Sequence, residues 1–131
     1  VSSAASDVYK RQALHTAEKI ALLVANAWEK RSTNGLRDVL AADFEYASQW
    51  VFDTMRGADT YVDYLTSKFN AIQRSCCNIN VKNTRYSDTL IEIDLEQSMT
   101  DTVKVVMLQL TISNGKITRA DMCAPAFRQL P

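Results

Sequence analysis

The chain has 131 residues, 47% of them hydrophobic and 23% charged, and its 15 basic residues balance its 15 acidic ones. This length favours one domain whose core needs neither disulfides nor a metal for support. The even charge, without a cluster of Lys or Arg, excludes the basic surface of a nucleic-acid-binding protein. No apolar run approaches the roughly 20 residues of a membrane span, and no signal-peptide pattern is present. We therefore expect neither nucleic acid nor a membrane as a partner.

The three cysteines are Cys76, Cys77 and Cys123. Adjacent cysteines form only a strained disulfide, and an odd count leaves one thiol unpaired, so we expect reduced thiols and a cytoplasmic location. Zinc sites use paired Cys and His spacings, whereas His15, the only histidine, lies far away in the sequence. With three glycines in the chain, no Gly-rich phosphate loop is present. We expect neither a metal nor a cofactor.

Residues 1–12 (VSSAASDVYKRQ) lack helical periodicity. They resemble a translated cloning-adapter sequence from environmental shotgun libraries, which would make the source metagenomic. The alternative interpretation is an ordinary disordered leader. In either case we exclude this stretch from the domain, which we place at 13–131.

The first predicted helix covers 13–31, where Ile20, Val24 and Trp28 recur every four residues and form an apolar stripe. The segment 32–35 (STNG) breaks this helix and offers N-cap residues for a short second one over 36–40.

The first strand is expected at about 43–52, and its alternation places five side chains on one face: Phe44, Tyr46, Ser48, Trp50 and Phe52. A turn at Arg56-Gly57 then leads into an amphipathic helix. The apolar positions of this helix are spaced four, four and three residues apart: Tyr61, Leu65, Phe69 and Ile72.

Three strand-like segments follow this helix. Cys77, Ile79 and Val81 mark the second strand, and the third has an apolar face formed by Ile91, Ile93 and Leu95. The fourth, at about 102–113, is apolar on both faces. We expect it to be central, with its second face covered by a partner chain.

Asn114-Gly115 is a strong hairpin signal, and it leads into the last strand, 116–123. The order helix, strand, helix and then consecutive strands predicts an α+β fold with one helix-backed curved sheet, rather than a parallel α/β fold.

Three short motifs accompany this order: Asp43-Phe44 at the first strand, Arg56-Gly57-Ala58-Asp59 at the start of the amphipathic helix, and Asn114-Gly115-Lys116-Ile117 before the last strand. With them, nearly all of 13–131 resembles the nuclear-transport-factor-2-like superfamily, also called cystatin-like or SnoaL-like. The resemblance implies a cone-shaped, curved mixed β-sheet wrapped around a long helix, with N-terminal helices. It also implies a pocket at the wide end and dimers through the outer sheet face.

The superfamily includes isomerases, dehydratases and hydrolases, and their catalytic sets are not matched here. The base of ketosteroid isomerases falls on Ser48, and their tyrosine and carboxylic-acid donors have no counterpart. Scytalone dehydratases use two histidines, whereas this chain has only His15. Limonene epoxide hydrolases use an Asp–Arg–Asp set, for which Arg119 and Asp121 on the last strand are the nearest candidates.

Asp121 is the one candidate for a general base, and the alternative is a surface ion pair with Arg119. The candidate ligand-binding residues lie on faces expected to line the pocket: Tyr46, Ser48, Trp50, Gln97 and Gln109. The alternative is that the aromatic residues pack under the long helix and that the two glutamines are strand-end residues near water.

We therefore expect a domain that binds a small, largely apolar molecule in the cone, without a recognised catalytic set. One alternative is a SnoaL-like cyclase, isomerase or hydrolase that acts on a hydrophobic substrate with Asp121 as base. Another is a structural dimerisation module whose side chains fill the cone. We also expect a homodimer through the outer sheet face.

Overall fold

The computed structural model of the chain describes residues 3–48, 53–75 and 77–124. Within these ranges the elements are, in chain order, α1 (Ser3–Lys30), the 3₁₀-helix η1 (Arg37–Val39), β1 (Leu40–Ser48), β2 (Met55–Arg56), α2 (Ala58–Arg74), β3 (Asn78–Tyr86), β4 (Leu90–Ser98), β5 (Val103–Ser113) and β6 (Lys116–Cys123). The predicted order of helices and strands, and with it the α+β class, is confirmed.

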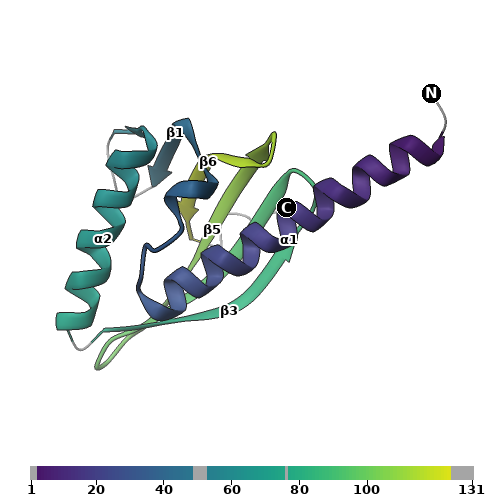
Figure 1. Ribbon diagram of the computed structural model, residues 1–131. Helices are drawn as coiled ribbons and strands as arrows, with labels where there is room; N and C mark the ends of the chain where they lie inside the picture. The colour runs from purple at the N-terminus through teal and green to yellow at the C-terminus, as the bar shows by residue number, and fades with distance from the viewer. Residues whose placement is uncertain (1–2, 49–52, 76, 125–131) are drawn as a thin grey trace.

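The strands form one mixed sheet in the order β2-β1-β6-β5-β4-β3. Neighbouring strands are antiparallel except β1 and β6, which are parallel. Figure 1 shows the curved sheet behind α1, with α2 lying along its β1 side. The predicted curved mixed sheet around a long helix is therefore confirmed.

Two turns depend on glycine. Gly57, just before α2, has φ 97°, and its N–H donates to the carbonyl oxygen of Phe44 at 2.7 Å. Asn114 and Gly115 have φ 52° and 75° between β5 and β6. Such positive angles favour glycine and asparagine. Both turns lie where the sequence predicts them.

The face of the sheet toward the helices, called the inner face below, is apolar. Its buried side chains include Phe44 and Tyr46 on β1, Ile91, Ile93 and Leu95 on β4, Val106, Leu108 and Leu110 on β5, and Ala120 and Met122 on β6. The predicted stripes of α1 and α2 pack against it. The ring of Trp28 on α1 meets that of Phe69 on α2 edge to face at 5.0 Å, which joins the two helices.

The opposite face, called the outer face, carries charged side chains in ion pairs. Arg85 on β3 contacts Asp94 on β4 at 2.8 Å. Arg119 on β6 contacts Asp121 at 3.0 Å and Glu45 on β1 at 3.1 Å. The Arg85–Asp94 and Arg119–Glu45 pairs join neighbouring strands, so they support the register of the sheet.

The strand β5 is central and apolar on both faces, as predicted. On the outer face, Met107 is only 2% exposed, and the Arg85 guanidinium approaches its sulfur at 3.9 Å. Val103 and Val105, nearer the start of the strand, are 65% and 43% exposed. A partner chain over this face stays a prediction.

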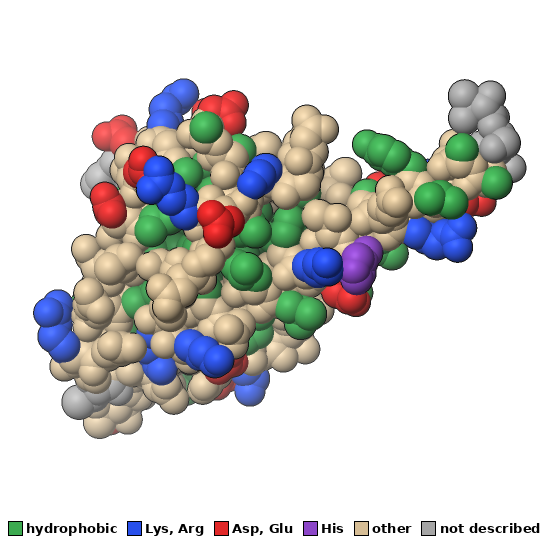
Figure 2. All heavy atoms as spheres, in the orientation of Figure 1, with side chains coloured by type: hydrophobic (Ala, Val, Ile, Leu, Met, Phe, Trp, Pro, Cys, Tyr) green, Lys and Arg blue, Asp and Glu red, His purple; other side chains and the backbone are tan. Residues whose placement is uncertain are grey.

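The helix α1 begins at Ser3, ten residues before the predicted start at residue 13. Residues 4–12 are exposed, and Figures 1 and 2 show this end of α1 projecting beyond the sheet. Once a helix has formed, each added residue gains a backbone hydrogen bond, so the helix can continue without tertiary contacts. An origin of residues 1–12 in a cloning adapter stays a prediction. Neither described α-helix has the length and apolarity that a membrane crossing requires.

The start of β1 also differs from the prediction. The strand begins at Leu40, and the short second helix is reduced to η1. Leu40 pairs with Ile117 on β6, and the register shifts between Leu40 and Glu45. Tertiary pairing has therefore drawn these residues into the sheet. The predicted continuation of the strand through 49–52 lies outside the described residues.

Candidate functional site

A cavity of about 230 Å³ lies between the inner face and the two α-helices, and we call it the cone cavity. Its apolar wall comes from every layer of the fold: Trp28 on α1, Ile79 on β3, Leu95 on β4, Val106 on β5 and Met122 on β6. Strand alternation aims these side chains inward, because residues two apart share a face. The wall is therefore formed by residues whose spacing in the sequence places them on the apolar faces of their elements.

Three hydroxyl groups lie in the same cavity. Tyr46 and Ser48 come from β1, and Tyr64 comes from α2. The rings of Tyr46 and Tyr64 are 5.6 Å apart, and the hydroxyl of Tyr46 hydrogen-bonds with both Ser48 and Tyr64. This set of three side chains is called the hydroxyl cluster below.

Burial raises the pKa of the Tyr46 hydroxyl above its ordinary value of about 10, and the proximity of Tyr64 raises it further. The hydrogen bond with Ser48 lowers this pKa, but the net shift is upward. Tyr46 therefore stays neutral above the pH at which an ordinary tyrosine ionises. Its hydroxyl accepts from Ser48 and donates to Tyr64, as the directions of the two effects on its pKa indicate.

Two lysines also line the cone cavity, Lys68 on α2 and Lys104 on β5. The ammonium of Lys68 lies 5.9 Å from the centre of the Tyr64 ring, within the range of a cation–π contact. Lys104 is opposite Gln97 of β4 in the sheet register. The cavity is thus largely apolar, with hydroxyl, amide and ammonium groups at part of its wall.

Three of the five residues predicted as ligand contacts line this cavity: Tyr46, Ser48 and Gln97. Gln97 lies near the end of β4, and its amide donates to the Cys77 sulfur at 2.9 Å. Trp50 lies outside the described residues. Gln109 is not in the cavity, because it is paired with Glu92 and Asp121 on the outer face.

Asp121 also lies on the outer face. Its neighbours on β6, Ala120 and Met122, point inward, so alternation turns Asp121 outward. Its carboxylate accepts from the guanidinium of Arg119 at 3.0 Å. The sequence left catalysis or an ion pair with Arg119 open, and the structure shows the ion pair. The geometry gives no support to a base role for Asp121 inside the cone.

Sequence reasoning did not assign Tyr64, Lys68 or Lys104 to the site. A signal for the first two was present, since they are four residues apart on α2 and flank its buried stripe. Lys104 lies two residues before Val106 on the same face of its strand. What the sequence lacked was the knowledge that these positions meet in one cavity.

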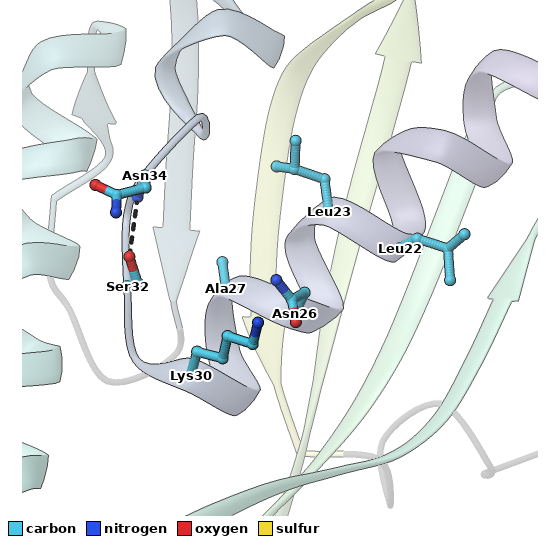
Figure 3. A pocket seen from close by; sticks show the side chains of 7 residues that line it. All are labelled: Leu22, Leu23, Asn26, Ala27, Lys30, Ser32 and Asn34. Carbon is cyan, nitrogen blue, oxygen red and sulfur yellow. Dashed lines mark hydrogen bonds between the residues drawn. The ribbon is translucent and has the colours of Figure 1, made fainter.

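A wider hollow, of about 670 Å³, runs along α1 and the turn after it. Figure 3 shows the side chains around it, including Leu22 and Lys30 on the helix and Asn34 on the turn. Lys30 is the one ionisable side chain that lines it, and Leu22 is 65% exposed. Its lining comes from one helix and the turn after it, whereas residues of both α-helices and of five strands line the cone cavity. We therefore regard the cone cavity as the candidate site.

The described residues contain no group of three or more His, Cys, Asp or Glu side chains that could hold a metal ion. Cys77 and Cys123 have intermediate exposure, and the Cys77 sulfur accepts the hydrogen bond from Gln97. The polar chemistry of the cone cavity is therefore that of its hydroxyl, amide and ammonium groups.

Solved structures of other proteins share this fold. An NTF2-like protein of unknown function from Mesorhizobium loti aligns with a TM-score of 0.72 and 11% identity, over 84% of this chain and 91% of that one. A steroid delta-isomerase from Pseudomonas aeruginosa aligns with a TM-score of 0.69 and 12% identity, over 82% and 78%. An LEH-like epoxide hydrolase from M. tuberculosis aligns with a TM-score of 0.63 and 13% identity, over 87% and 86%.

These likenesses show that the chain has the nuclear-transport-factor-2-like fold, as the sequence motifs indicated. The sequence itself matches no protein-family model, and no curated protein matches it. Since one fold supports many activities, function has to be argued from the cone cavity.

Proposed function

We propose that the protein binds a small, largely apolar molecule with a hydrogen-bonding group in the cone cavity. The observation that carries this proposal is the convergence of an apolar wall and the hydroxyl cluster in one cavity. Ligand sites typically combine apolar walls with a few placed polar groups. Two of the compared proteins are named a steroid isomerase and an epoxide hydrolase, and these names also support a small-molecule ligand.

The size of the cavity limits the ligand. A volume of about 230 Å³ equals that of several water molecules, each of which occupies about 30 Å³ in the liquid. We therefore expect a molecule of one ring or two fused rings. A structural module with a completely filled cone is less compatible with a cavity of this size.

Binding is favoured over catalysis with Asp121 as base. The Asp121 carboxylate is held by Arg119 on the outer face, across the sheet from the hydroxyl cluster. The described ionisable residues that line the cavity are Tyr46, Tyr64, Lys68 and Lys104. None of these is a carboxylate, so this described lining gives no support to a cyclase, isomerase or hydrolase that uses Asp121 as base.

The test uses 2-naphthol, a neutral two-ring molecule with one hydroxyl group, in isothermal titration calorimetry. We expect binding with a micromolar dissociation constant. The change Val106→Phe extends a side chain into the cavity and should weaken binding at least tenfold. Ser48→Ala removes one member of the hydroxyl cluster and should weaken binding about fivefold, since a hydrogen bond contributes about 1 kcal/mol.

The matched control is Thr111→Phe, which adds an aromatic ring to an exposed outer-face position of the same strand. It should leave 2-naphthol binding unchanged. Absence of binding to the parent protein, or equal binding by Val106→Phe and Thr111→Phe, would contradict the proposal. Circular dichroism of each variant shows whether it has folded.

We also propose that two chains form a homodimer through the outer face. The exposed Val103 and Val105 on β5 support this proposal, because a second copy that covers them would remove their apolar surface from water. The Arg85 and Arg119 ion pairs lie on the same face and supply both signs of charge to a second copy.

A further inference from the structure

The charged side chains that line the cone cavity are all positive among the described residues. Lys68 and Lys104 both line it, and no described residue that lines it is acidic. The stretches outside the described ranges (1–2, 49–52, 76 and 125–131) contain no Asp or Glu in the sequence. The wall of the cavity therefore carries positive charge in a chain whose total charge is zero.

The carboxylates of the sheet lie on the other side. On the outer face, Arg85 pairs with Asp94 at 2.8 Å, and Arg119 pairs with Asp121 at 3.0 Å. Lys82 lies 3.9 Å from Glu96 on that face as well. These cations of the outer face thus have acidic partners on the same face.

The two lysines lie where they can act on one bound molecule. Lys68 is half-buried, and its ammonium stays beside the ring of Tyr64. Lys104 extends from the inner face of β5, two residues from Val106 in the apolar wall. A lysine can pack its stem on apolar surface while its ammonium approaches a ligand.

The hydroxyl cluster complements these cations. Ser48 donates to Tyr46 and Tyr46 donates to Tyr64, so Tyr64, at the end of this series, is the member placed to donate to an acceptor in the cavity. Hydrogen bonds and ammonium contacts to a carboxylate are shorter and stronger than those between neutral groups. A carboxylate can use both kinds of donor at once, and it is the smallest common organic anion that does so.

We propose that the ligand of the cone cavity is a small apolar carboxylic acid, bound as its anion. Its carboxylate contacts Lys68 and Lys104 and accepts a hydrogen bond from the hydroxyl cluster. Its one or two rings pack against the apolar wall of Trp28, Leu95 and Val106. This inference rests on the proposed function, because it names the chemical class of the molecule that the cavity binds.

The test compares three probes with the same naphthalene frame: 2-naphthoate, an anion; 2-naphthol, a neutral molecule; and 2-naphthylmethylammonium, a cation. In calorimetry at low salt, we expect 2-naphthoate to bind about tenfold more tightly than 2-naphthol, and the cation to bind most weakly. Added salt should weaken the binding of 2-naphthoate and leave that of 2-naphthol unchanged, because salt screens charges.

Substitutions then show which lysines interact with the carboxylate of 2-naphthoate. Lys68→Met and Lys104→Met keep most of the apolar stem and remove the ammonium. Each should weaken 2-naphthoate binding about threefold and leave 2-naphthol binding within twofold. The double variant should bind both probes equally. Lys30→Met and Lys82→Met, outside the cone cavity, are matched controls and should preserve the preference for 2-naphthoate.

The outcomes separate the two proposals. Equal binding of 2-naphthoate and 2-naphthol, or a preference that survives the double variant, overturns the carboxylate proposal and leaves the binding function intact. If neither probe binds to the parent protein, the proposed function fails, and the carboxylate proposal fails with it. A preference for 2-naphthoate that Lys30→Met or Lys82→Met abolishes would place the anion outside the cone cavity and overturn the inference.

Discussion

Tyr46 and Tyr61 lie side by side in the core, with ring centres 4.9 Å apart and exposed fractions of 2% and 3%. Burial raises the pKa of both hydroxyls, and their tyrosine neighbours raise them further. The cause is the cost of placing a phenolate where water is absent. At Tyr46 this effect keeps the hydroxyl neutral, so that it can donate to Tyr64 within the hydroxyl cluster.

These raised pKa values predict how stability depends on alkaline pH. Below pH of about 10, the tyrosines are protonated in both the folded and the unfolded chain, so their contribution to stability is fully present. Above it, the unfolded chain loses these protons first, and the free energy of unfolding falls as pH rises. We expect urea midpoints to decrease above pH of about 10, together with the appearance of tyrosinate absorbance.

The control is Tyr61→Phe, which removes one of the two hydroxyls. The fall in its urea midpoint above pH of about 10 should be shallower than in the parent protein. If the two proteins lose stability with the same dependence on pH, ionisation of Tyr61 does not cause the loss of stability at alkaline pH. Tyr9→Phe, at a 73% exposed position on α1, should leave the dependence unchanged.

At the scale of elements, the two faces of β6 have different roles: one face contributes to the cone cavity, and the other forms ion pairs. Ala120 and Met122 point to the inner face, and Met122 lines the cone cavity. Arg119 and Asp121 point outward, and Arg119 reaches Glu45 on β1 at 3.1 Å. The outward residues thus connect β6 with its parallel neighbour, and the inward ones line the site.

This arrangement predicts a mild effect of Asp121→Asn. The side chain is 34% exposed, and ion pairs at such positions contribute less than about 1 kcal/mol. We expect a loss of that size in urea unfolding and no change in 2-naphthoate or 2-naphthol binding. A large loss of binding with unchanged stability would instead bring Asp121 back as a site residue.

At the scale of the whole molecule, the outer face combines ion pairs with exposed valines at the start of β5. Val103 and Val105 lie beside each other on that face, two residues apart. Burial of such residues against a second copy would remove apolar surface from water, at about 25 cal/mol per Å². The ion pairs around them would form the polar rim of such an interface.

The homodimer predicts a mass twice that of the 14.7 kDa chain in light scattering at micromolar concentration. Val105→Glu places a charge in the interface and should give the mass of one chain. Leu22→Glu, at a 65% exposed position on α1, should leave the dimer intact. A single-chain mass for the parent protein would rule the homodimer out.

Much of the fold could be read from local periodicity. The spacing of Tyr61, Leu65 and Phe69 predicts the buried stripe of α2, and Asn114-Gly115 predicts the hairpin. These features depend on residues close in the chain, whose geometry repeats every two or every 3.6 residues. The start of α1 was wrong because a helix can extend by local hydrogen bonds alone, without an apolar stripe.

The candidate site could be predicted in part. Tyr46 and Ser48 lie in the cone cavity because they share the apolar face of their strand. Gln109 and Asp121 lie on the outer face, although each shares a strand with inward residues. Alternation shows which residues share a face, but it leaves open which of the two faces becomes concave.

The sequence by itself determined the α+β class, the order of the elements and the apolar face of each, because these follow from local geometry and periodicity. Only the tertiary structure decided that β1 pairs with β6 in parallel and that Tyr64, Lys68 and Lys104 meet Tyr46 in one cavity. The β1–β6 pairing joins residues up to 77 positions apart, as Leu40 and Ile117 are, and Tyr46 and Lys104 of the cone cavity are 58 positions apart. No local pattern encodes them, because they depend on how the sheet curves and on which strands become neighbours.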